Sequence, residues 1–140
     1  MLSFLLSALL LQPASPPPPS PLPAPACAAM DQSLPAGLAA WATPAPAGTA
    51  VQPGQAVTTS PATPLTLEIA EAGTYGVALD QGAWIDVARD GETLRSAAHG
   101  HGPACSTIRK IVDFALQPGR YTITLSRTQA ASVRLLVVRR

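Results

Sequence analysis

The second half of the chain contains short runs in which apolar residues alternate with polar or small ones. A period of two is typical of strands that bury one face and expose the other. We expect strands at 65–69, 75–79, 84–87, 112–116, 121–125 and 133–137. No stretch after Trp41 has a convincing helical period. The pattern predicts an all-β fold, a small antiparallel β-sandwich of the jelly-roll-like kind.

Length and charge narrow the class further. The 140 residues suit one domain, and only 4% are aromatic, so Ala, Val, Leu and Ile must supply the core. The net charge of +1 does not indicate the basic surface that a nucleic-acid-binding protein needs. We expect a signal peptide and Pro-rich segment over 1–26, an N-terminal arm and loop over 27–63, and the β-sandwich core over 64–140.

Two stretches of the sequence resemble each other. Gly73–Leu79 and Gly119–Leu125 share the order Gly-x-Tyr followed by alternating aliphatic residues. Each follows a predicted strand and a turn, so we expect one hairpin in each sheet, with the tyrosine ring inward and its hydroxyl at the rim. A third turn is expected at Asp90-Gly91, a dipeptide typical of tight hairpins.

The N-terminus indicates export. Leu2–Leu11 is an apolar run of signal-peptide length, too short to span a bilayer as a helix. Eight of the 16 prolines follow within Pro13–Pro25, where a helix cannot form. Ala24–Ala26 is a small-x-small cleavage site that makes Cys27 the first mature residue. We expect a periplasmic or secreted protein with no stable membrane span after signal cleavage.

The two cysteines indicate one disulfide, Cys27–Cys105, because an exported chain meets an oxidising compartment. Closing a loop of about 80 residues is worth ~4 kcal/mol in the chain-entropy model. Two free thiols are the alternative. Lipidation of Cys27 is another, although Ala24 stands where a lipidation signal normally has Leu.

The N-terminal arm has a helix-like cluster over 34–41, which we expect to pack Leu38 and Trp41 on the domain. The segment 42–64 is rich in Pro, Ala, Gly and Thr. We expect a loop there, with one short strand around Ala56–Thr59.

The only two histidines, His99 and His101, stand in a Gly-rich loop. On extended backbone, alternate side chains share one face, so both imidazoles can reach one transition metal, with zinc or copper ahead of iron. Cys105 is a third ligand if its thiol is free. The alternative is a structural polar loop anchored by Cys105.

Other catalytic combinations have less support. Ser96 and His99 with Asp86 or Asp90 would form a nucleophile, base and acid, but no Gly-x-Ser-x-Gly motif is present. Asp86 and Asp113 would form a carboxylate pair, but both alternate outward on predicted strands, where exposed carboxylates are ordinary. The sequence has no phosphate loop, dinucleotide fingerprint or Cys-x-x-Cys.

Two resemblances are visible. The strand pattern over 65–138, with its "PGRYTITLS", is similar to β-sandwich modules of the pre-peptidase C-terminal type on secreted bacterial enzymes. The early Cys27, "LP..LA.W", "WIDV" and "HGHGPxCxxIRK" resemble a group of small exported bacterial proteins often called homogentisate dioxygenase. That resemblance implies iron chemistry at the His99/His101 loop.

The residues favour a non-catalytic, exported cell-envelope binding or accessory module without a cofactor. Its partner would be an unidentified envelope protein or ligand. The alternative is a small metal-dependent enzyme, homogentisate dioxygenase-like, that uses the His99/His101 loop. Weak zinc or copper binding is expected at most, and iron only if the dioxygenase resemblance reflects chemistry.

Overall fold

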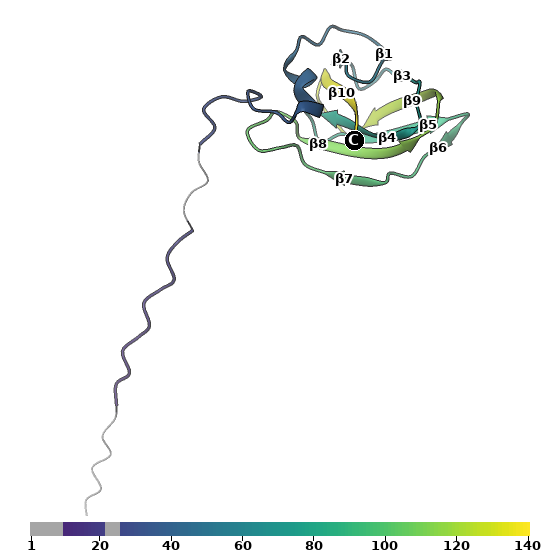
Figure 1. The fold of residues 1–140 in the computed structure, drawn as a ribbon. Helices are drawn as coiled ribbons and strands as arrows, with labels where there is room; N and C mark the ends of the chain where they lie inside the picture. The colour runs from purple at the N-terminus through teal and green to yellow at the C-terminus, as the bar shows by residue number, and fades with distance from the viewer. Residues whose placement is uncertain (1–9, 22–25) are drawn as a thin grey trace, which may run out of the picture.

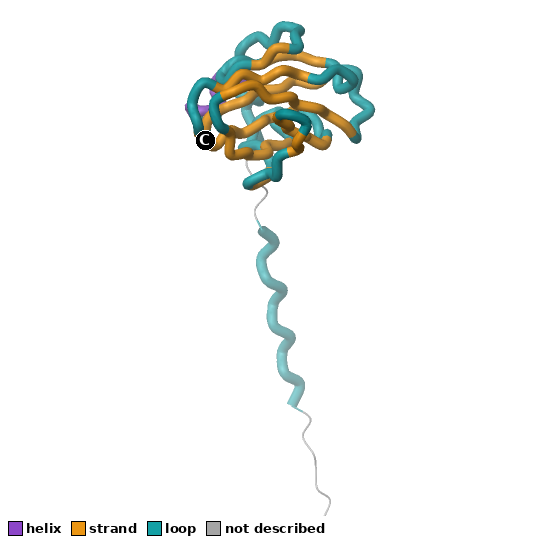
Figure 2. Tube along the Cα trace, turned by 90° about the vertical axis from the view of Figure 1, so that its right-hand side faces the viewer, coloured by secondary structure: helices purple, strands orange, loops and turns teal. Residues whose placement is uncertain are grey.

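The computed structural model describes residues 10–21 and 26–140. Most of the predicted apolar run and two residues of the predicted cleavage site, Ala24 and Pro25, lie outside the described residues. Residues 10–21 are exposed, contain no helix or strand, and extend away from the domain (Figures 1 and 2). Within the described part, no helix has both the length and the apolarity to cross a membrane.

Two five-stranded sheets pack against each other (Figure 1). Sheet I contains, in spatial order, β1 (Ala50–Val51), β3 (Leu65–Ile69), β9 (Gly119–Ser126), β5 (Trp84–Arg89) and β6 (Glu92–Thr93). Sheet II contains β2 (Val57–Thr59), β10 (Val133–Arg139), β4 (Gly73–Leu79), β8 (Lys110–Leu116) and β7 (Ala98–Gly100). Paired strands are antiparallel except β1 and β3. The predicted all-β sandwich is therefore confirmed, and its first strand, the edge strand β1, begins at Ala50.

Aliphatic side chains from both sheets fill the space between them. β9 alternates strictly, with Tyr121, Ile123 and Leu125 buried and the residues between them exposed. The same alternation occurs along β3. The period-two runs thus mark the faces that meet in the core, where burial of apolar area stabilises the fold.

The two similar stretches do not form the expected hairpins. β3 lies in sheet I and β4 in sheet II, and β8 and β9 are likewise in different sheets. Each pair of strands is an arch between the sheets, and each arch pairs with the other: β3 with β9, and β4 with β8. The hairpin prediction is wrong because alternation identifies the buried face of a strand but not its partner. The turn at Asp90-Gly91 is a hairpin, with positive φ at both residues.

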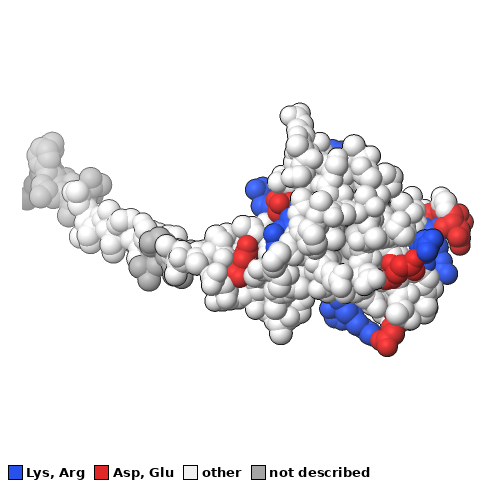
Figure 3. Space-filling view, turned by 90° about the horizontal axis from the view of Figure 1, so that it is seen from above, with Lys and Arg blue, Asp and Glu red and all other residues white. Residues whose placement is uncertain are grey.

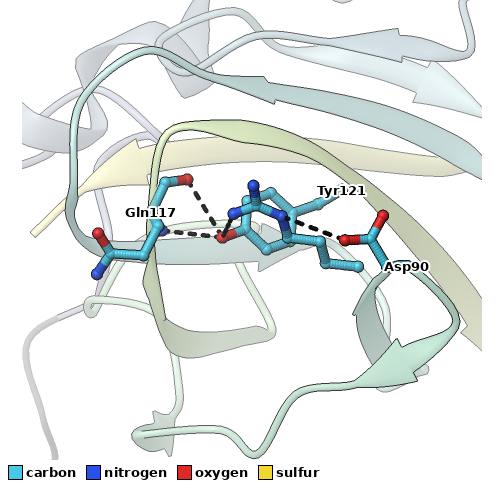
Figure 4. A network of polar contacts seen from close by, with 4 residues as sticks. Asp90, Gln117 and Tyr121 are labelled. Atoms are coloured by element: carbon cyan, nitrogen blue, oxygen red, sulfur yellow. Dashed lines mark hydrogen bonds and ion pairs between the residues drawn. The ribbon is translucent and has the colours of Figure 1, made fainter.

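In each arch, a tyrosine near the start of the second strand forms a hydrogen bond back to the turn before that strand. The Tyr75 hydroxyl donates to the carbonyl of Glu71 at 2.7 Å. The Tyr121 hydroxyl donates to the carbonyl of Gln117 at 3.2 Å and accepts from the Gln117 N–H at 2.9 Å (Figure 4). Both rings are buried, as predicted. Such tyrosine corners fix the crossing of a chain between two sheets.

An arginine covers the second tyrosine corner. Arg89 donates to the Tyr121 hydroxyl at 3.3 Å, and its guanidinium lies 5.4 Å from the ring centroid. Asp90 lies 3.9 Å from Arg89 in the same network (Figure 4). Gly119 has a φ of 144°, and a Cβ there would lie 2.8 Å from the Arg89 guanidinium. The backbone angle is what favours glycine here, because the guanidinium is the flexible end of a side chain and can shift.

The N-terminal arm packs on the outer face of sheet II. A 3₁₀ helix, η1 (Ala36–Ala42), buries Leu38 and Trp41, as expected from the sequence. These side chains join a second apolar cluster, separate from the core between the sheets. Leu136 and Val138 of β10 belong to this cluster, so β10 is buried on both faces.

A disulfide between Cys27 and Cys105 joins the arm to the loop between β7 and β8, which confirms the predicted pair. Hydrogen bonds reinforce this connection. The Asp31 carboxylate accepts from the Thr107 N–H at 2.8 Å and from its hydroxyl at 2.5 Å. Trp41 Nε1 donates to the same hydroxyl at 2.9 Å. Because Cys27 forms the disulfide, its sulfur is not free for lipidation in this structure.

Replacing either cysteine should destabilise the domain by a similar amount, because either loss opens the same loop. We expect Cys27→Ser and Cys105→Ser each to cost about 2–4 kcal/mol and to lower the Tm. Thermal unfolding followed by circular dichroism measures the effect, and the double variant should lose little more than either single one. Full alkylation of both thiols in the native, unreduced protein would contradict the bond.

The two tyrosine corners should differ in strength. Tyr75→Phe removes one hydrogen bond and should cost about 1 kcal/mol. Tyr121→Phe should cost more, up to about 2 kcal/mol, because the Gln117 N–H loses its acceptor and Arg89 loses its contact. Urea denaturation of both variants measures the difference. Equal losses would show that the additional contacts of Tyr121 contribute nothing.

Candidate functional site

A cleft of about 450 Å³ lies between the edge strands of the two sheets. β5 and β6 of sheet I form one wall, and β7 and β8 of sheet II form the other, joined by the connection 94–97. The cleft is lined by Trp84, Ile85, Asp86, Thr93, Leu94, Arg95, Ser96, His99, Lys110, Val112 and Phe114. It is thus at the open side of the sandwich, where the core nears the surface.

The floor of the cleft is apolar because it is the edge of the core. Ile85, Val112 and Phe114 belong to the core between the sheets. Leu94 is partly buried and packs against the same core from the β6–β7 connection. A ligand that enters the cleft therefore meets aliphatic and aromatic carbon at its base.

Trp84 is at the mouth and, among the described residues, is the aromatic side chain most exposed to solvent, at 48%. Its Nε1 donates to Asp86 at 3.1 Å. Lys110 Nζ and the Arg127 guanidinium lie 5.5 and 5.0 Å from the ring centroid, within cation–π range. Lys110 Nζ also donates to the carbonyl of Ala83 at 2.9 Å. These contacts hold the indole in place although it is half-exposed.

A second hollow of about 240 Å³ adjoins the cleft. It is lined by Gly82, His99, Gly100, His101, Arg109 and Lys110. His99 and Lys110 line both spaces, so the two lie side by side. We call this second space the basic hollow, because Arg109 and Lys110 line it and no carboxylate among the described residues does.

The register of β7 explains the position of His99. His99 is opposite Val112 in the β7–β8 pair, and Val112 points into the core. Directly opposed residues of antiparallel strands share a face, so His99 points toward the cleft. His101 follows the strand and reaches the same hollow. The structure therefore brings both predicted histidines to one space.

Cys105, the predicted third metal ligand, cannot supply a thiolate because its sulfur forms the disulfide with Cys27. Among the residues that the structure describes, no group of three or more His, Cys, Asp or Glu side chains is placed to hold a metal ion. The histidine pair thus has only these two protein ligands within the described part of the chain.

The carboxylates considered from the sequence are dispersed. Ser96, His99 and Asp86 line the same cleft, but no hydrogen bond joins them in the described part of the molecule. Asp90 is at the β5–β6 turn beside Arg89. Asp113 lies 3.2 Å from Arg140 and does not line the cleft. Asp86 and Asp113 therefore do not form a pair.

Sequence reasoning missed the cleft and several residues that form it. Leu94, Arg95 and Phe114 line it, and Arg127 covers Trp84, although they come from distant parts of the sequence. One signal was available: Trp84 precedes Ile85, whose inward position on the strand implies an outward tryptophan. A large apolar side chain at an outward position is an informative exception.

No protein-family model matches the chain, and no curated protein matches it. Among solved structures, it is similar to the pre-peptidase C-terminal domain of a collagenase from Bacillus anthracis. The two are 16% identical, the TM-score is 0.40, and the match covers 67% of this chain and 96% of that one. Because a fold does not determine what a domain binds, function must be inferred from the site itself.

Proposed function

We propose that the chain is an exported, non-catalytic binding or accessory module of the cell envelope, and that the cleft beside Trp84 is its binding site. The observation that carries the proposal is the half-exposed indole, held by Asp86 and two cations over an apolar floor. Small-molecule sites are typically concave, largely apolar and several hundred Å³ in volume, with a few polar groups that orient the ligand.

Two features support the export part of the proposal. The Cys27–Cys105 disulfide is a bond that persists in oxidising compartments and is rare in the cytosol. The sequence also starts with an apolar run of signal-peptide length followed by a Pro-rich stretch. Together they favour a periplasmic or secreted location.

A small metal-dependent enzyme is the second candidate. The observation in its favour is that His99 and His101 line one hollow. Against it, Arg109 and Lys110 line the same hollow, and their positive charges oppose a bound cation. The geometry therefore supports the binding module better.

The cleft should bind small apolar fragments ahead of any other surface. In a fragment screen followed by ¹⁵N NMR, we expect the largest shifts at Ile85, Leu94 and Val112. Trp84→Ala should weaken such binding by about tenfold through loss of an aromatic contact. Arg120→Ala, which removes an exposed arginine outside the cleft, should leave binding unchanged. Shifts centred elsewhere, or none, would contradict the proposal.

Metal binding should be weak. Two imidazoles and water form an exchangeable site, so we expect low-affinity Zn²⁺ or Cu²⁺ binding that is lost in the His99→Ala/His101→Ala variant. Calorimetric titration of the oxidised protein measures it. Arg109→Ala should bind no more weakly than the unmodified protein, because it removes a repelling charge. Tight binding that survives loss of both histidines would place the metal elsewhere.

A further inference from the structure

The arginine and lysine side chains of the molecule differ in whether they have a carboxylate partner. Four arginines form ion pairs with carboxylates, and Arg134 donates to the carbonyls of Trp41 and Thr43. Besides Arg134, the cations without a carboxylate partner among the described residues are Arg95, Arg109, Lys110 and Arg127. On the face shown in Figure 3, several of the basic groups lie next to acidic ones.

Apart from Arg134, these cations all lie around one site. Arg95 and Lys110 line the cleft, Arg109 and Lys110 line the basic hollow, and Arg127 lies over Trp84. Asp86 is the one carboxylate among the described lining residues, and it accepts the Trp84 N–H. The site therefore has a positive balance, although the whole chain is close to neutral.

Lys110 and Arg109 retain donors for a ligand. An ammonium has three donors, and Lys110 directs one to the carbonyl of Ala83. The Arg109 backbone N–H bonds to Leu79, while none of the described hydrogen bonds or ion pairs uses its guanidinium. A guanidinium matches a carboxylate in a bidentate way, so this pair of cations suits an acid group.

We propose that the ligand is a small amphipathic organic acid. Its apolar chain would lie in the cleft against Leu94 and Phe114, and its carboxylate would lie in the basic hollow between Arg109 and Lys110. His99 and Lys110 line both spaces, so the two halves of one such molecule would meet at these two residues. This inference rests on the proposed function, because it assigns a ligand class to the same cleft.

Three probes with the same chain and different heads test the ligand class. Octanoate, 1-octanol and octylamine are titrated into the ¹⁵N-labelled, oxidised protein below their aggregation concentrations. Octanoate should bind at least ~5-fold more tightly than 1-octanol, as expected for a partly exposed charge contact, and octylamine should bind most weakly. Shifts at the amides of Leu94, His99 and Lys110 should locate the site.

Two neutral variants identify the cations responsible. Lys110→Met and Arg109→Met keep an unbranched apolar side chain, and each should reduce the preference for octanoate over 1-octanol by ~3- to 5-fold. The preference is the ratio of the two dissociation constants in the same variant, so a general weakening of binding in the cleft cancels from it. Arg120→Met is the matched control, since its guanidinium pairs with Glu68 outside the site, and it should preserve the full preference.

The possible failures are distinct. If 1-octanol or octylamine binds in the cleft as tightly as octanoate, the ligand class is wrong and the proposed binding site remains. An octanoate preference that survives both Met substitutions also overturns the assignment of the acid group. If none of the three probes shifts the cleft residues, the proposed function itself fails, together with the inference built on it.

Discussion

The two short connections at 70–72 and 117–118 determine how the central strands pair. Each carries the chain from one sheet to the other, so neither strand of an arch can bond to its neighbour in sequence. Each strand pairs instead with a strand of the other arch, and Ile69 pairs with Gly119 while Leu116 pairs with Gly73. The tyrosine corners fix both crossings, and β5 and β10 add to this central set. The cleft exists because the outer strands β6 and β7 are too short to close the sandwich beside it.

The N-terminal arm connects the back of sheet II to the site. It covers Leu136 and Val138, and through Cys27 and Asp31 it holds the loop between β7 and β8. That loop folds back so closely that a Cβ at Gly102 would lie 2.2 Å from the carbonyl oxygen of Ile108. The arm thus restrains the segment that places His101 beside the hollow, although it lies far from the cleft in sequence.

Much of the fold could be predicted from the sequence, because each successful inference depended on local information. Alternation identified the strands, the Gly-x-Tyr repeat identified two inward rings, and an even cysteine count identified the disulfide. Leu38 and Trp41 were recognised as buried for a similar reason. The arch crossings could not be predicted, since both a hairpin and an arch bury the same alternate residues. Nor could β1, a two-residue strand in a segment rich in Pro, Ala, Gly and Thr.

The candidate site was harder to predict, because it combines side chains that the sequence separates. His99 and His101 were recognised as a pair, and both line the basic hollow. Their neighbours Arg109 and Lys110 reach it only through the β7–β8 register, and Trp84 comes from the other sheet. Single-strand patterns contain no information on which sheet edges face each other, so the cleft is a property of the tertiary structure alone.

The crossed pairing of the arches has a consequence for how the molecule is made. A chain that leaves a ribosome or a translocation pore from its N-terminus presents residues 65–79 before their partner strands in 110–125 exist outside. Such non-local pairing must wait, and folding dominated by it is slow. Cys27 has to wait in the same way for Cys105. Almost the whole chain must therefore emerge before any central strand has both of its partner strands. Until then, the nascent chain depends on its surroundings to keep its apolar segments apart.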